Sequence, residues 1–98
     1  MKQLDKELTA DFESFVAYWV GKSYKTGILG KARTRWQLTK AWNSRLAHAG
    51  IPGIVRKQLG EEEATRLFQD TSDKILSNKV LLELAIDNFR SQDMFNQL

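Results

Sequence analysis

Apolar residues recur at steps of three and four positions along most of this chain, and this spacing is the feature that most constrains its fold. The first series, between about residues 5 and 20, is built from Leu4, Leu8, Phe12, Phe15, Val16 and Trp19. Residues spaced in this way share one face of an amphipathic helix. Similar series over about residues 31–48, 60–77 and 79–90 predict three more helices, and no segment shows the sustained alternation of a β-strand. We therefore expect an all-α fold, with residues 1–98 forming one small domain, a bundle of about four main helices.

Glycines separate the first two helical series. Gly21 is predicted to end the first helix. Residues 22–30 contain two further glycines together with Ser and Thr, so they are predicted to form a basic loop of about nine residues between the first and second helices. Ile28 and Leu29 are expected to form an apolar plug that anchors this loop on the apolar interior.

The second helix is predicted to end at the segment 50–53, which reads Gly-Ile-Pro-Gly. Residues 54–59 are then expected to form only a short helical turn. An alternative interpretation joins the second helix, this turn and residues 54–59 into a helix-turn-helix. In that case the residues facing a DNA groove would be Arg56, Lys57 and Gln58.

One face of the second helix is predicted to point into the core. At 100° per residue this face carries Leu38, Trp42, Leu46 and Ala49. Trp36 points elsewhere, with Arg33 and Lys40 one turn away on either side. Two roles are open for Trp36, because its ring could stack on a nucleic-acid base or pack against the first helix with the two cations along its rim.

The composition argues against several kinds of chemistry. The chain has no cysteine and a single histidine, His48, so zinc sites, disulfides and the usual nucleophile–base pairs are not expected. We therefore expect no enzyme activity, no metal and no cofactor. The N-terminal residues resemble no signal peptide and no apolar run is long enough for a membrane helix, so a cytoplasmic location away from membranes is expected.

Charge is concentrated in the middle of the chain, although the net charge is only +3. Residues 22–57 contain nine Lys and Arg and no Asp or Glu, whereas both flanks carry more acids than bases. Such a block attracts phosphates, unless acids of the flanking helices neutralise it. We predict nucleic-acid binding, with the type of nucleic acid left open, through Lys22, Tyr24, Lys25, Lys31, Arg33, Lys40, Arg56 and Lys57.

The last helical series is apolar nearly all round, which favours either a central place in the core or an interface. This pattern supports an alternative function, a small protein-binding adaptor or inhibitor, for example a bacteriophage protein that acts on a host complex. Its partner would be a replication or other host protein, or a second copy in a homodimer. The residues expected to contact the partner are Leu82, Ile86, Met94, Phe95 and Leu98.

Two short motifs between residues 11 and 36 resemble a known kind of module. They read Phe12-Glu13-x-Phe15-x-Ala17-Tyr18 and Gly30-Lys31-Ala32-Arg33-x-x-Trp36. These motifs resemble helical modules of bacteriophage and plasmid replication proteins, and the first stretch is similar to the C-terminal part of the primosomal protein DnaT. The resemblance implies single-stranded DNA binding or helicase loading, with Lys31 and Arg33 contacting phosphates and Phe12, Phe15 and Trp36 packing.

Overall fold

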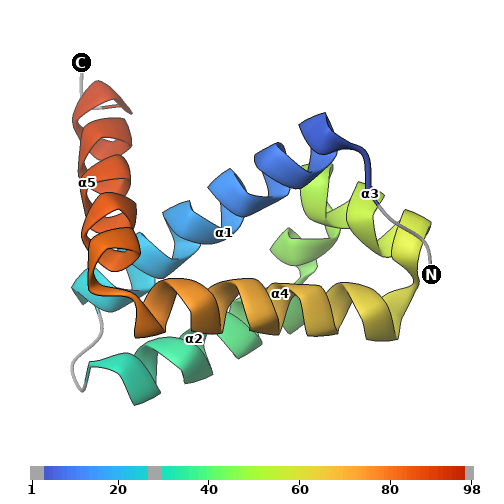
Figure 1. The fold of residues 1–98 in the computed structure, drawn as a ribbon, viewed down its shortest axis with the longest axis horizontal. Coiled ribbons are helices and arrows are strands. Elements are labelled where there is room, and N and C mark those ends of the chain that lie inside the picture. Colours follow the sequence, from blue (N-terminus) through green and yellow to red (C-terminus); the bar gives the residue numbers. More distant parts are fainter. Residues whose placement is uncertain (1–3, 27–29, 97–98) are drawn as a thin grey trace.

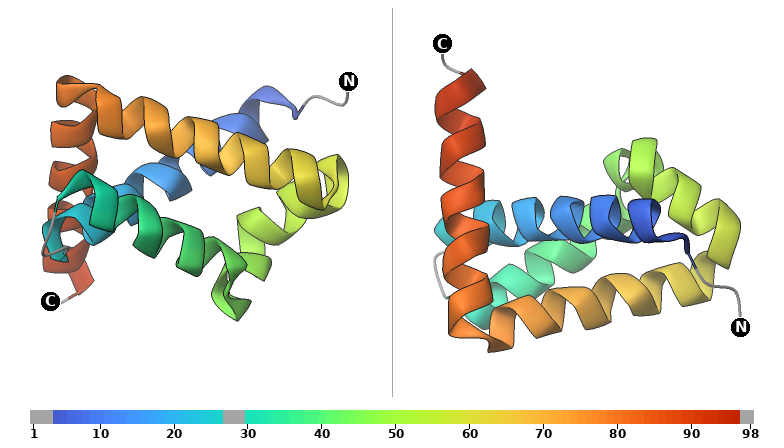
Figure 2. Two further views of the ribbon diagram at one scale, coloured as in Figure 1. Left: turned by 90° about the horizontal axis from the view of Figure 1, so that it is seen from below. Right: turned by 45° about the horizontal axis from the view of Figure 1, so that its top comes forward.

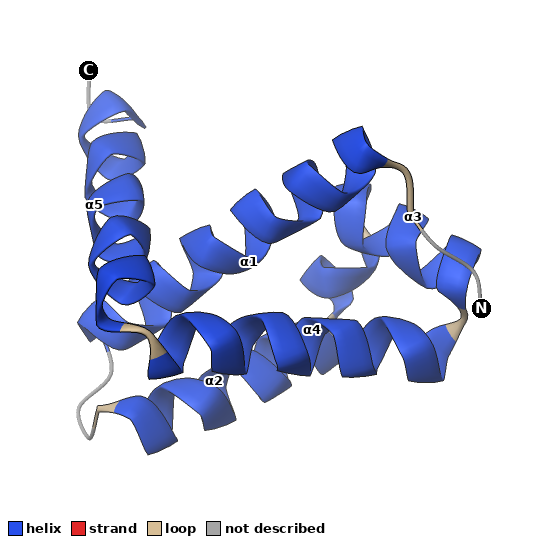
Figure 3. Ribbon diagram, viewed as in Figure 1, coloured by secondary structure: helices blue, strands red, loops and turns tan. Residues whose placement is uncertain are grey.

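The structure, a computed structural model, describes residues 4–26 and 30–96, and within these ranges it is entirely helical with no strand (Figures 1 and 3). The helices are α1 (Lys6–Thr26), α2 (Lys31–Asn43), the short 3-10 helix η1 (Arg45–His48), α3 (Gly50–Leu59), α4 (Glu61–Ser77) and α5 (Lys79–Asn96). The predicted all-α class is confirmed. Its count of four main helices is wrong by one, because residues 50–59 form a full helix.

Helix α1 lies at the centre of the arrangement and packs against α2, α3, α4 and α5. Helix α4 packs on α2 and α3 as well, and α3 closes one end of the molecule (Figure 1). At the other end α5 crosses the C-terminal part of α1, and its own C-terminal half extends beyond the other helices (Figures 1 and 2).

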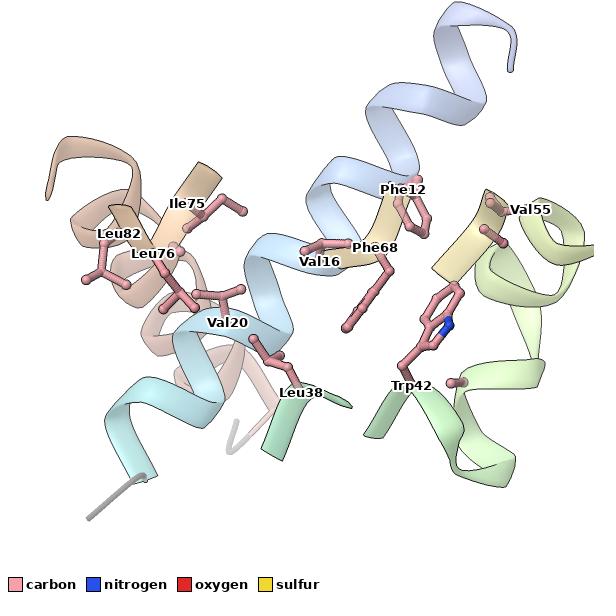
Figure 4. Packing of buried hydrophobic residues seen from close by; sticks show 13 residues of the cluster. Phe12, Val16, Val20, Leu38, Trp42, Val55, Phe68, Ile75, Leu76 and Leu82 are labelled. Atoms are coloured by element: carbon pink, nitrogen blue, oxygen red, sulfur yellow. The ribbon is translucent and has the colours of Figure 1, made fainter. Parts of the chain in front are cut away.

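The core forms where α1, α2 and α4 meet, and it is built around aromatic rings (Figure 4). The ring of Trp42 stacks on Phe68 with a centroid separation of 4.5 Å and meets Phe12 edge-on at 6.0 Å. The indole Nε1 of Trp42 donates a hydrogen bond of 2.9 Å to Oγ1 of Thr65, which satisfies its one polar atom. Val16 and Leu38 are also buried. The predicted core position of Trp42 is confirmed.

Helix α1 does not end at Gly21, as the sequence suggested, but continues through it to Thr26. The reason is a close crossing with α5. A Cβ atom on Gly21 would lie 2.2 Å from the backbone oxygen of Ala85, so only glycine permits the two helices to approach this closely. Lys22 and Tyr24 therefore lie on a helix and not in a loop. The expected apolar plug, Ile28 and Leu29, falls outside the described residues.

Helix α2 ends earlier than expected, at Asn43, because Ser44 adopts an extended conformation and its hydroxyl donates a 2.6 Å hydrogen bond to the oxygen of Ala41. The prediction that Leu46 and Ala49 continue the core face of the second helix is therefore wrong: Leu46 is 72% exposed and Ala49 is also exposed.

The segment 50–53 begins α3 and does not terminate α2. Pro52 occupies the first turn of α3, where a helix makes no use of the missing N–H. Position 53 has no room for a side chain, since a Cβ atom there would lie 2.3 Å from the backbone oxygen of His48, and glycine avoids this collision.

Candidate nucleic-acid interface

The solvent-exposed surface of α2 carries cations and no acid. Lys31, Arg35 and Lys40 are exposed on different sides of the helix, and α2 as a whole contains no Asp or Glu. Arg35 forms an ion pair of 3.3 Å with Asp73 of α4, and both side chains remain largely solvent-accessible. Within the described residues Lys31 and Lys40 form no ion pair. We refer to Lys31, Arg33, Arg35, Trp36 and Lys40 together as the α2 cationic face. Lys31 and Arg35 lie on its side toward α4, and Arg33, Trp36 and Lys40 lie together further round the helix.

Trp36 lies in the middle of this face and is 49% exposed. The guanidinium carbon of Arg33 lies 4.7 Å from the centre of its ring, and Nζ of Lys40 lies 4.3 Å from it. Both distances are within the range of cation–π attraction. Half of the Trp36 side chain faces solvent between two cations and Trp36 is not part of the core cluster, so its ring is accessible for the stacking role.

A hollow of about 360 Å³ lies beside the start of α2. Lys31 and Arg35 line it from α2, and Asp73 and Ser77 line it from α4. The residue that precedes the helix, Gly30, has no side chain to bond the first N–H groups of α2, which leaves partial positive charge at this end. The sequence-based list of binding residues omitted Arg35, although its spacing of four from Lys31 places both on one side of the helix.

Arg56 was predicted to bind phosphate, and the structure places it inside the protein. It is only 8% exposed. Its guanidinium carbon lies 4.4 Å from the ring centre of Trp42, Nη2 donates to the oxygen of Trp42, and Nη1 donates to Oε1 of Glu61 at 2.9 Å. Nη1 also lies 2.7 Å from Nδ1 of His48. With its donors directed inward, Arg56 holds the end of α2 against α3 and α4, and it does not face a DNA groove in the manner of a helix-turn-helix.

The remaining predicted binding residues belong to other helices than α2. Lys22 is exposed on α1, with Nζ 4.9 Å from the ring centre of Trp19. Tyr24 is half-buried and packs against the core, so its ring is not a free stacking surface. Lys57 is exposed on α3. The side chain of Lys25 lies outside the described part of the chain.

The predicted partner-binding residues differ in how far they are exposed. Leu82 is buried against the core, so it is not available to a partner, and Ile86 is half-buried. The side chains of Met94 and Phe95, and all of Leu98, lie outside the described residues. Among the described side chains of α5, the large apolar residues that are exposed are Val80 and Leu84, which were not predicted from the sequence.

Two other kinds of feature are absent from the described residues. Over residues 4–26 and 30–96, no three His, Asp or Glu side chains converge as metal ligands. None of the helices in these ranges is both long enough and apolar enough to cross a membrane. Comparison of the chain with protein-family models, curated proteins and solved structures finds no match.

Proposed function

We propose that this protein binds nucleic acid through the α2 cationic face. The observation that carries the proposal is the half-exposed ring of Trp36 between Arg33 and Lys40, on a helix without a carboxylate. Lysine and arginine side chains attract the phosphate backbone, and an accessible aromatic ring offers a base a surface on which to stack.

The charges of this face support a polyanion as the ligand. Lys31, Arg33 and Lys40 form no ion pair with a carboxylate among the described residues, so their charges are not neutralised there. The ion pair between Arg35 and Asp73 is largely exposed, and such pairs are held by about 1 kcal/mol or less, so a phosphate can compete for Arg35. Binding of this kind releases counterions and weakens steeply as salt is raised.

The test is fluorescence anisotropy with labelled single-stranded DNA, duplex DNA and RNA at several concentrations of salt. We expect binding that weakens steeply between about 50 and 200 mM salt. The preferred oligonucleotide identifies the class of nucleic acid. Absence of binding to all three at low salt would refute the proposal.

Matched variants locate the interface. Lys31→Glu combined with Lys40→Glu should abolish binding. The control, Lys74→Glu on α4 combined with Lys79→Glu on α5, changes the net charge of the protein by the same amount and should retain much more of the binding. Trp36→Ala should weaken binding by about tenfold or more, because base–aromatic stacking contributes about 1–3 kcal/mol per base. Equal losses in the two double variants would show that only net charge matters, which contradicts an interface on α2.

A further inference from the structure

A groove of about 570 Å³ lies between α1, α4 and α5, away from the residues of the α2 cationic face. Its apolar lining includes Ala17 of α1, Ile75 of α4 and Leu84 of α5. Leu84 is 59% exposed at the edge of this groove. Water therefore contacts an apolar surface that a partner could cover with a gain in free energy.

The groove extends along about two turns of α1 and of α5, which cross beside it (Figure 1). Its wall on α1 runs from Ala10 to Ala17 and its wall on α5 from Leu81 to Asn88. Each wall spans seven residue steps, about 10 Å or two helical turns. The small side chains of α1 leave room for larger side chains of an incoming helix. Because the walls are helices whose backbone groups bond within themselves, they offer no sheet edge to which an extended peptide could add.

The charges around the groove indicate the chemistry of the occupant. Glu13 and Asp70 line it, with Lys74 as the single base, and within the described residues neither carboxylate is in an ion pair. The charged lining of the groove is thus two acids and one base. A polyanion is repelled from such a surface, and a cationic segment is attracted to it.

We propose that this groove binds a cationic amphipathic helix of a partner protein, with the apolar stripe of that helix on Leu84 and its Lys or Arg residues beside Glu13 and Asp70. This site is separate from the α2 cationic face and does not depend on nucleic-acid binding. It differs from the interface expected from the sequence, because Leu84 is exposed at this groove, whereas the predicted Leu82 is buried.

The chain itself offers a matched pair of variants. Val80 lies one turn before Leu84 on α5 and is 65% exposed, but it does not line the groove. Leu84→Lys and Val80→Lys therefore make the same chemical change at similar exposure, inside and outside the site. Circular dichroism of both variants shows whether the helical fold is retained.

The probes are two fluorescein-labelled amphipathic helical peptides, one of leucine and lysine and the other with glutamate in place of lysine. We expect anisotropy to show binding of the lysine peptide in preference to the glutamate peptide. Leu84→Lys should weaken this binding by about tenfold or more, and Val80→Lys should change it by less than about twofold. Glu13→Lys combined with Asp70→Lys should reverse the preference between the two peptides.

Several results would overturn the proposal. These are absence of binding of the lysine peptide, equal binding of both peptides, and equal losses in the Leu84→Lys and Val80→Lys variants. A dimer seen by analytical ultracentrifugation that Leu84→Lys alone dissociates would also overturn it, because a second copy would then be the occupant of the groove. Oligonucleotide binding by the Leu84→Lys variant, measured in parallel, keeps this outcome distinct from that of the proposed nucleic-acid interface.

Discussion

Replacing Arg56 by alanine should destabilise the fold far more than replacing its ionic partner Glu61 by glutamine. Both residues belong to one ion pair, yet their surroundings differ, since the side chain of Arg56 is 7% exposed and that of Glu61 is 74% exposed. When the pair is broken, the exposed carboxylate of Glu61 can form hydrogen bonds with water instead. The buried groups that the guanidinium of Arg56 bonds have no access to water and would be left without a partner.

The expected magnitude follows from the contacts of Arg56. The carbonyl of Trp42 belongs to the last turn of α2, where it has no helical partner, so losing the bond from Nη2 costs about 1–3 kcal/mol. Losing the guanidinium over the ring of Trp42 costs about 1–2 kcal/mol. Relief from the desolvation of a buried charge offsets part of this sum. We expect Arg56→Ala to lower the free energy of unfolding by about 2–4 kcal/mol, and Glu61→Gln by less than about 1 kcal/mol.

The assay is thermal and urea unfolding followed by circular dichroism. For a chain of this size 1 kcal/mol corresponds to about 4–8 °C in Tm, so Arg56→Ala should lower Tm by about 10–25 °C. Arg56→Lys should recover part of the loss, because an ammonium group keeps the charge without the planar fork of donors. A loss of under about 0.5 kcal/mol in Arg56→Ala, or equal losses in Arg56→Ala and Glu61→Gln, would refute this reasoning.

Two further predictions concern helix packing and capping. Gly21→Ala should lower the free energy of unfolding by about 1–3 kcal/mol, because the new methyl group must push α1 away from the oxygen of Ala85, and a urea curve that overlays the wild type would contradict the close crossing. Asn78→Ala should cost about 1 kcal/mol, because Oδ1 of Asn78 accepts the N–H groups of Val80 and Leu81 at 3.0 and 3.2 Å at the start of α5, while Asn78→Asp should retain most of the stability.

Apolar spacing was enough to predict the long helices and the burial of Trp42, because these depend on residues close together in sequence. It failed at Gly21 and at segment 50–53 for one physical reason. Without tertiary information, glycine and proline predict the end of a helix. Here, however, Gly21 permits contact with Ala85, more than sixty residues away in the sequence, and Pro52 lies in the first turn of α3. The outcome depends on tertiary contacts that spacing does not contain.

The candidate site was predicted only in part, and the charge block shows why. Lys57 and Arg56 are adjacent cations in the sequence, yet one is exposed and the other is buried on Trp42. Composition treats them alike, and only the contact of the Arg56 side chain with Trp42 at the end of α2 distinguishes them. The exposed position of Trp36 was likewise one of two open roles, because a helical wheel shows that a residue leaves the core face without showing whether another helix covers it.

The different surroundings of Trp36 and Trp42 supply this protein with two intrinsic optical reporters. Trp42 is enclosed and stacked on Phe68, so its asymmetric environment produces near-ultraviolet circular dichroism that disappears when the core loosens. Trp36 faces water between two cations, so its emission is accessible to external quenchers. A ligand on α2 would shield the second signal and leave the first unchanged, and unfolding would change both. Once the third tryptophan, the half-buried Trp19, is replaced by Phe, binding and folding of the unlabelled chain can therefore be followed separately in one cuvette.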